Sequence, residues 1–150
     1  MTVDIMAFGI SHKFASVDLR GQVSFAPESV VETLQTAVDE LGLSEMALLS
    51  TCNRTEVYAV GDVTDQQWLD WLANKKHQTI ERLQDSYYCH RNHEAIRHMI
   101  CVASGLDSLV VGEPQIFGQI KSAYSVARKA KTVKTQLNMA FQWAFAVAKR

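Results

Sequence analysis

The sequence is poor in the features that mark secreted, membrane-spanning or disordered chains. It has three cysteines, a small and odd number that does not suit a disulfide framework. Its amino terminus, MTVDIMAFGISHK, lacks the basic segment and apolar run of a signal peptide. No apolar run reaches the roughly 18 residues that a membrane span requires. These absences favour a cytoplasmic protein with reduced thiols and no membrane contact.

The composition suits one globular domain, but its charge is unevenly distributed. Of 150 residues, 47% are hydrophobic and 21% are charged, which is enough for a core and argues against disorder. The formal net charge is only −1, so overall charge names no partner. Residues 119–150, however, contain seven basic side chains and no acidic one. This segment either binds a polyanion or forms a solvated helix face, and the sequence leaves both interpretations open.

Hydrophobic periodicity predicts a chain of alternating strands and helices. Strands are expected at 5–10, 46–49, 56–60 and 87–90, and helices at 17–25, 30–41, from about 65, and 93–104. The order strand, helix, strand, strand, helix, strand indicates an α+β fold. We expect a ferredoxin-like split β-α-β sandwich, with an antiparallel sheet and helices on one face. Additional C-terminal helices are expected at 120–131 and 133–149.

The last predicted helix, at about 133–150, is apolar on most sides and has no stop signal before the sequence ends. A helix of this kind needs a neighbour to cover it. We therefore expect residues 1–150 to form one domain of a longer protein, with this helix leading toward C-terminal domains absent from the sequence.

The segment LLSTCNRTEVYAV, residues 48–60, places Cys52 in a polar turn between two predicted strands. A thiolate is a strong nucleophile, and a nearby cation favours it. Arg54 is positioned in the sequence to supply that charge or to bind a substrate carboxylate through two hydrogen bonds. Thr51 and Asn53 add hydrogen-bonding groups. The alternative is a buried, inert cysteine, which is the commoner fate of a free thiol.

A base for such a nucleophile is offered by the segment CHRNHEAIRHMIC, residues 89–101, which holds three histidines. On the predicted helix, Ala95, Met99 and Val102 form one apolar stripe, and His98 lies beside it. The alternative is a histidine at the surface or at the core edge. Four residues could also be read as metal ligands, but their spacing matches no standard zinc pattern and we expect no metal: Cys89, His93, His98 and Cys101.

A glycine- and proline-containing segment, GLDSLVVGEPQIFGQ, follows this helix. It is not a phosphate-binding loop, because five residues separate Gly112 from Gly118 and Lys121 does not follow the second glycine directly. The sequence also has no G-x-G-x-x-G run, so no dinucleotide site is visible. The polar residues Asp107, Ser108, Glu113 and Gln115 suit either a specificity pocket or a structural turn that caps helices.

Together, the segments at 9–20, 48–58 and 103–124, with His98, resemble the N-terminal catalytic domain of the glutamyl-tRNA reductase family. The resemblance implies an NADPH-dependent oxidoreductase that reduces the glutamyl group esterified to tRNA(Glu), giving glutamate-1-semialdehyde. This is the first committed step of the five-carbon route of tetrapyrrole (porphyrin) biosynthesis. It also implies that Cys52 is the nucleophile that forms a thioester and that His98 supports it. The implied substrate contacts are Thr51, Cys52, Asn53, Arg54, Ser108, Glu113, Pro114, Gln115 and Gln119.

The family's NADPH-binding and helical dimerisation domains would follow Arg150, so by this resemblance residues 1–150 hold no cofactor site and do not complete the reduction alone. Implied partners are charged tRNA(Glu), a second copy in the full-length protein, and the next pathway enzyme, glutamate-1-semialdehyde aminomutase. Two other classes remain: a cysteine-dependent esterase or acyltransferase, and a non-catalytic RNA-binding module. The second lacks the aromatic signature of common RNA-binding sheets.

Overall fold

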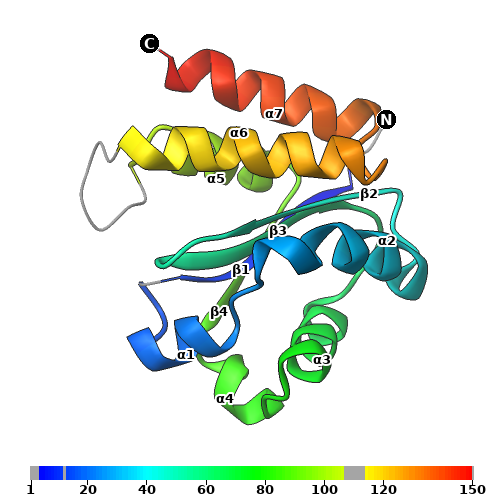
Figure 1. The fold of residues 1–150 in the computed structure, drawn as a ribbon, viewed down its shortest axis with the longest axis vertical. Helices are drawn as coiled ribbons and strands as arrows, with labels where there is room; N and C mark the ends of the chain where they lie inside the picture. Colours follow the sequence, from blue (N-terminus) through cyan, green and yellow to red (C-terminus); the bar gives the residue numbers. More distant parts are fainter. Residues whose placement is uncertain (1–3, 12, 107–113, 150) are drawn as a thin grey trace.

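The computed structural model describes residues 4–11, 13–106 and 114–149, in which one antiparallel sheet lies between two layers of helices (Figure 1). The fold is therefore a mixed helix-and-strand architecture. Its elements, in chain order, are β1 (Ile5–Ser11), α1 (Val17–Gln22), the 3-10 helix η1 (Pro27–Ser29), α2 (Val30–Leu41), β2 (Glu45–Ser50), β3 (Arg54–Val60), α3 (Asp65–Lys76), α4 (Ile80–Gln84), β4 (Tyr87–Arg91), α5 (His93–Ala103), α6 (Pro114–Lys129) and α7 (Thr135–Ala148).

The four strands lie in the order β2-β3-β1-β4, and each neighbouring pair is antiparallel. In the register, Gly9 faces Glu56 and Ser11 faces Arg54 across the β1–β3 pair. Because side chains alternate along a strand, Arg54, Glu56 and Tyr58 share one face of the sheet, and Thr55, Val57 and Ala59 share the other.

The second of these faces is covered by α1 to α4 (Figure 1) and is held by aromatic packing. Phe8 on β1 stacks on Trp68 of α3, with ring centroids 5.5 Å apart, and Trp68 meets Trp71 edge to face. A capping box formed by Thr64 and Gln67 begins α3, the helix expected from about residue 65. This layer is one part of the apolar core, which continues through α5, α6 and α7 on the other face, and it carries none of the predicted catalytic residues.

The face that carries Arg54, Glu56 and Tyr58 is covered by α5, α6 and α7 (Figure 1). Tyr58 meets Phe141 of α7 edge to face, with centroids 5.7 Å apart. The buried carboxylate of Glu45 accepts backbone hydrogen bonds at the start of α7, including one of 3.1 Å from Leu137. α5 and α7 thus pack on the same side of the sheet, and α5 brings His98 over β3.

The predicted strands and main helices are confirmed, with boundary differences that have local causes. The helix predicted at 17–25 ends at Gln22, and the short α4 was not predicted. α6 begins at Pro114 rather than at 120, because proline is well accommodated in the first helical turn, where its missing N–H has no partner to lose. Within the described residues, no helix is long and apolar enough to cross a membrane.

Candidate active site

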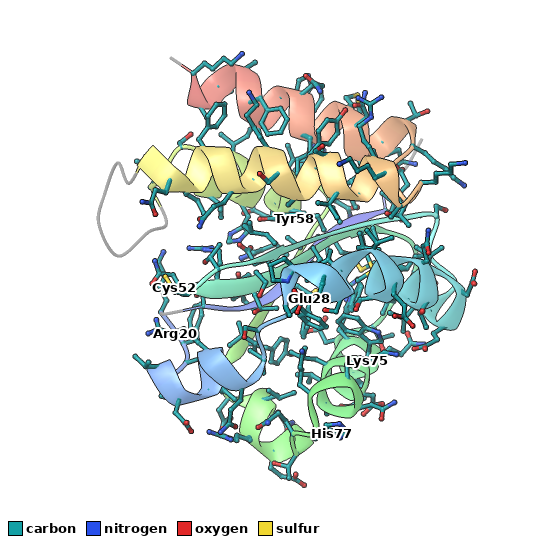
Figure 2. All side chains as sticks on the ribbon, in the orientation of Figure 1. Arg20, Glu28, Cys52, Tyr58, Lys75 and His77 are labelled. Atoms are coloured by element: carbon teal, nitrogen blue, oxygen red, sulfur yellow. The ribbon has the colours of Figure 1, made fainter. Side chains whose placement is uncertain are left out.

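The turn between β2 and β3 presents Cys52 to solvent. The backbone N–H of Thr51 donates to the carbonyl of Arg54 at 2.8 Å, and the N–H of Asn53 donates to Thr51 Oγ1 at 3.1 Å. These bonds close the turn with Cys52 at its exposed tip, and Figure 2 shows it at the end of the sheet. Its thiol is accessible, so the inert, buried alternative does not hold for this residue.

A second set of hydrogen bonds ties the base of this turn to the segment before η1. Ser50 Oγ accepts a 2.9 Å hydrogen bond from the backbone N–H of Phe25 and lies 3.3 Å from Thr55 Oγ1. The side chains on both sides of the turn are therefore fixed by contacts on the opposite face of the sheet from Arg54. The thiol is mounted on a restrained turn rather than on a long loop.

Arg54 begins β3 and turns its guanidinium into the protein. Arg54 Nη1 donates to Glu56 Oε2 at 2.8 Å, and the two side chains are 1% and 0% exposed. Burial lowers the pKa of Arg54, but the charge of Glu56 outweighs this effect and the pKa is raised. The guanidinium is thus permanently charged and paired inside the sheet layer, and its predicted contact with substrate stays a prediction.

Glu56 lies between Arg54 and His98 and joins the two. Glu56 Oε1 is bonded to His98 Nε2, while Oε2 accepts from Arg54 and, at 3.2 Å, from the hydroxyl of Tyr58. Burial raises the pKa of Glu56, but the charges and hydrogen bonds of His98 and Arg54 outweigh it and lower the pKa to about 2. The carboxylate is therefore ionised and accepts bonds on both oxygens. Sequence reasoning missed Glu56 because its place inside a strand suggested only a structural role.

Gly9 makes room for this network. A Cβ built at Gly9 would lie 2.7 Å from Glu56 Cγ and 2.7 Å from the hydroxyl oxygen of Tyr88. Any larger residue would push the carboxylate away from its partners. The sequence carried a signal here, since a glycine in the middle of an apolar strand often marks a close approach of another group.

His98 sits at the core edge, with its side chain 11% exposed, beside the buried stripe of Ala95, Met99 and Val102 that the sequence predicted. Its ring also packs on the rings of Tyr88 and His90, with centroids 5.1 and 4.6 Å away. The ring lines a cavity of about 280 Å³ together with other mostly polar residues. These are Ser11, Lys13, Phe14, Tyr88, His90, Glu94, Arg97 and Cys101.

The register connects this cavity with the cysteine turn. Ser11, on its wall, pairs with Arg54, which is two residues from Cys52. Within the described residues, Cys52 and His98 do not form a hydrogen bond to each other. The structure therefore places Cys52 at the end of the sheet and His98 over β3, where Glu56 fixes the imidazole.

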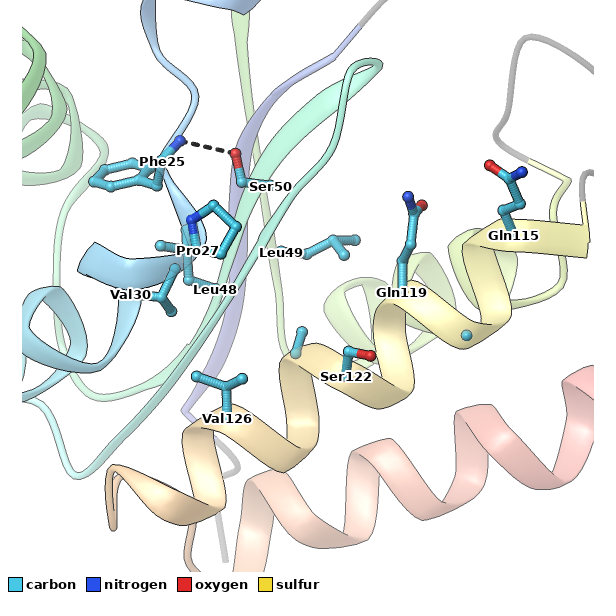
Figure 3. A pocket seen from close by; sticks show the side chains of 12 residues that line it. Phe25, Pro27, Val30, Leu48, Leu49, Ser50, Gln115, Gln119, Ser122 and Val126 are labelled. Carbon is cyan, nitrogen blue, oxygen red and sulfur yellow. Dashed lines mark hydrogen bonds between the residues drawn. The ribbon is translucent and has the colours of Figure 1, made fainter.

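A second cavity, of about 600 Å³, runs along the edge strand β2 between α2 and α6 (Figure 3). Gln115 and Gln119, both predicted substrate contacts, project from α6 beside it, and Ser50 lies on the opposite wall. The rest of the lining is largely apolar: Phe25, Pro27, Val30, Leu48, Leu49, Gly118, Ser122, Ala123 and Val126. This groove starts near the cysteine turn and can hold an extended group.

Some predicted residues lie outside this description. Ser108 and Glu113 are not among the described residues, nor is Asp107, and the side chain of Pro114 is not described either. Of the alternative metal ligands, Cys89 has its pKa raised to about 12 by burial. Among the residues that the structure describes, no three histidine, cysteine or acidic side chains gather to hold a metal ion.

The described residues do not fit NADPH. Dinucleotide sites use parallel strands joined to helices by a glycine-rich turn, whereas each strand pair here is antiparallel and the sequence has no G-x-G-x-x-G run. No step of the chemistry below is therefore routed through that cofactor.

Comparisons with known proteins match this sequence and this fold. Residues 8–150 match the sequence model of the family "Glutamyl-tRNAGlu reductase, N-terminal domain". Similar proteins include glutamyl-tRNA reductases of Saccharophagus degradans, 49% identical, and Pseudomonas syringae pv. syringae, 51% identical, each over 97% of this chain. The solved structure of glutamyl-tRNA reductase from Methanopyrus kandleri superposes with a TM-score of 0.81 at 35% identity, covering 99% of this chain.

In each case the chain spans only about a third of the relative, 34% of its length. The match therefore concerns one domain of these proteins. Because the family model covers nearly the whole sequence, the chain belongs to the family of glutamyl-tRNA reductase N-terminal domains.

Proposed function

We propose that this chain is the part of a glutamyl-tRNA reductase that binds charged tRNA(Glu) and forms a thioester with its glutamyl group. The observation that carries the proposal is the exposed Cys52 on a hydrogen-bonded turn, at the sheet end where Glu56 holds His98. The similar proteins are glutamyl-tRNA reductases, and their name supplies the substrate class. Reduction to glutamate-1-semialdehyde with NADPH is the proposed activity of the whole protein.

In the proposed reaction, Cys52 Sγ attacks the carbonyl carbon of the glutamyl ester. A C–S bond forms, the C–O bond to the terminal ribose breaks, and the ribose oxygen takes a proton. The thioester carbonyl is less stabilised by resonance than the ester and accepts hydride more readily, so one difficult step becomes two easier ones.

His98 is the proposed proton carrier. With Nε2 bonded to Glu56, its other ring nitrogen, Nδ1, is the atom through which a proton can be exchanged with the reacting groups. A carboxylate that fixes the orientation of an imidazole in this way is a recurring device in covalent catalysis.

The substrate contacts are proposed from the resemblance and from position. Gln115 and Gln119 line the groove beside β2, and Thr51 and Asn53 flank the nucleophile. Arg54 is proposed as the partner of the glutamyl side-chain carboxylate, which would select against glutamine by charge. Because its guanidinium is 1% exposed, this role requires the substrate to reach it at the base of the turn. Ser108, Glu113 and Pro114 are proposed from the resemblance alone.

The wider features of the family are proposed on the same basis. They are a homodimer, a functional pairing with glutamate-1-semialdehyde aminomutase, a cytoplasmic location, and a helix at 133–150 that leads toward further domains. We also propose the ferredoxin-like split β-α-β description, which the strand order β2-β3-β1-β4 and the placement of α2 and α3 on one face support.

The test is covalent capture of the acyl group. We expect the chain, mixed with tRNA(Glu) carrying radiolabelled glutamate and quenched in acid, to retain label that hydroxylamine releases. Cys52→Ser should abolish this label, whereas Cys101→Ser, which changes a second thiol near His98, should keep it.

Labelling that survives in Cys52→Ser would contradict the proposal. Equal acylation by a small activated ester and by charged tRNA would favour the esterase or acyltransferase class. Binding of tRNA without acylation would favour a non-catalytic RNA-binding module.

A further inference from the structure

The charges of this protein are segregated along the chain. Residues 119–150 hold seven of the 15 basic residues and none of the 16 acidic ones. Residues 1–118 therefore hold all 16 acidic residues and only eight basic ones. An asymmetry of this size between parts of one domain is a signature of polyanion binding.

Four cations of this segment gather where α6 ends and α7 begins, and we call them the basic end: Arg128, Lys129, Lys131 and Lys134. All four are exposed. Within the described residues none of them forms an ion pair, whereas Lys75, Arg82 and Arg91 on the rest of the surface each pair with a carboxylate. The basic end therefore presents charge that the described residues leave uncompensated.

The basic end also borders a hollow. A cavity of about 560 Å³ is lined by Arg128, Lys134 and polar neighbours. Arg128 lies over the ring of Tyr124, 5.8 Å from its centroid, and the Tyr124 hydroxyl donates to Asn138. These contacts hold the Arg128 guanidinium beside hydrogen-bonding side chains. Phosphate oxygens are commonly bound by such a combination of a cation and polar side chains.

Helix electrostatics explains only part of this arrangement. Cations near the C-terminus of a helix are stabilised by its dipole, which accounts for Arg128 and Lys129 in the last turn of α6. Lys134, however, is the residue just before α7, where the helix dipole disfavours positive charge. Lys131 has a φ of 63°, a left-handed conformation that favours glycine over lysine. Both lysines occupy positions that local structure alone would not select.

We propose that the basic end binds the phosphate backbone of the RNA whose 3′ terminus carries the ester to Cys52. The proposal rests on the proposed function. One face of α6 lines the groove beside β2 from Gln115 onward, and its other end carries Arg128 and Lys129. Cys52 and the α6–α7 turn lie toward opposite sides of the same view (Figures 1 and 2).

The length of α6 sets which phosphates are contacted. Its 16 residues span about 24 Å at about 1.5 Å per residue. In a stacked strand, phosphates are about 3.4 Å apart along the axis, so the length of α6 between the start of the groove and the basic end corresponds to about seven nucleotides. These contacts fix the position of the RNA and are independent of its sequence.

The test uses the double variant Lys131→Gln/Lys134→Gln, with Lys75→Gln/Arg82→Gln on the other side of the sheet as the matched control. Binding of uncharged tRNA(Glu) is measured by fluorescence anisotropy between 50 and 200 mM salt. Two lost phosphate contacts should flatten the slope of log K against log salt by about 1.4–1.8, which weakens binding at 0.1 M salt about 25- to 60-fold when the electrostatic contribution vanishes near 1 M salt. The control should bind like wild type.

Two further measurements separate this proposal from the proposed function. Acylation of Cys52 by a small activated ester should be unchanged in the double variant, as should binding of a trinucleotide that ends in CCA. If the variant keeps the wild-type salt slope while charged tRNA still acylates Cys52, the surface is refuted and the function stands. If charged tRNA never acylates the wild-type protein, the function itself fails. A change in oligomeric state without a change in RNA binding would also overturn the surface.

Discussion

Replacing Glu56 by glutamine removes one buried negative charge while keeping the size and shape of the side chain. Its partner Arg54 is 1% exposed and stays charged, so the variant leaves a cation inside the protein without its counterion. Breaking one side of a buried ion pair typically costs about 3–5 kcal/mol, because the remaining charge has lost its solvation as well as its partner. We expect the free energy of unfolding to fall by about that amount.

The assay is thermal and urea unfolding followed by circular dichroism. For a domain of this size, each kcal/mol lowers Tm by about 2–4 °C, so the loss corresponds to a fall of roughly 6–20 °C. The matched control is Glu40→Gln, which removes a carboxylate from the half-exposed pair with Lys75 and should cost no more than about 1 kcal/mol.

A double-mutant cycle makes the reasoning refutable. The double variant Arg54→Met/Glu56→Gln also removes the Arg54 charge, which Glu56→Gln alone leaves buried without a counterion. The double variant should therefore be at least about 1 kcal/mol more stable than the sum of the single effects implies. A Glu56→Gln loss below about 1 kcal/mol, or strict additivity in the cycle, would refute the claim that the carboxylate neutralises a buried cation.

Three other predictions follow from the same region. Because the pKa of Glu56 falls from its usual 4.5 to about 2 in the folded protein, its contribution to stability is fully present above about pH 4.5 and is lost as the pH falls toward 2. In Glu56→Gln, the free energy of unfolding should therefore depend less on pH in that window. An unchanged slope would contradict the lowered pKa of Glu56. Gly9→Ala should lower the free energy of unfolding by about 1–3 kcal/mol, because its Cβ would lie 2.7 Å from Glu56 Cγ and 2.8 Å from the Thr55 carbonyl oxygen. The control is Gly21→Ala, where nothing lies within 4 Å of the added Cβ. Equal effects of the two substitutions on urea unfolding would contradict the claim that the space at Gly9 is needed by Glu56. Alkylation by iodoacetamide near pH 8, read by peptide mass spectrometry, should modify exposed Cys52 well before Cys89, whose pKa burial raises to about 12; faster modification of Cys89 would contradict the described burial.

Local rules predicted much of this fold. Alternating apolar runs located the strands, and the helix expected from about residue 65 is α3, which Thr64 caps. The apolar stripe of α5 was predicted from three residues at helical spacing, which placed His98 at its edge. The short polar stretch around Cys52 indicated a turn, and the structure shows that the thiol on it is exposed. Each of these features depends on residues a few positions apart, where sequence pattern and geometry are directly linked.

Other features could not be predicted because they depend on residues far apart in the chain. The sequence suggested that Arg54 favours the Cys52 thiolate or binds a substrate carboxylate, but it gave no sign that the strand register pairs Arg54 with Glu56 inside the protein. The start of α6 at Pro114 is an exception, because it agrees with a local rule, the preference of proline for the first helical turn. The glycines around Pro114 instead favoured a loop. Whether the basic residues of 119–150 formed one patch also depended on how α6 and α7 meet.

The sequence by itself determined that this chain alternates strands and helices, places Cys52 in a polar turn and resembles one family along most of its length. The tertiary structure alone decided that Glu56, at the centre of a strand, joins Arg54 to His98, which lies 42 residues beyond it. The physical reason is that the buried carboxylate of Glu56 needs three things from other parts of the chain. They are the counterion Arg54, the partner His98 above the sheet, and the space that Gly9 leaves in the neighbouring strand. Strand pairing and helix packing bring these three together, and no local pattern encodes them.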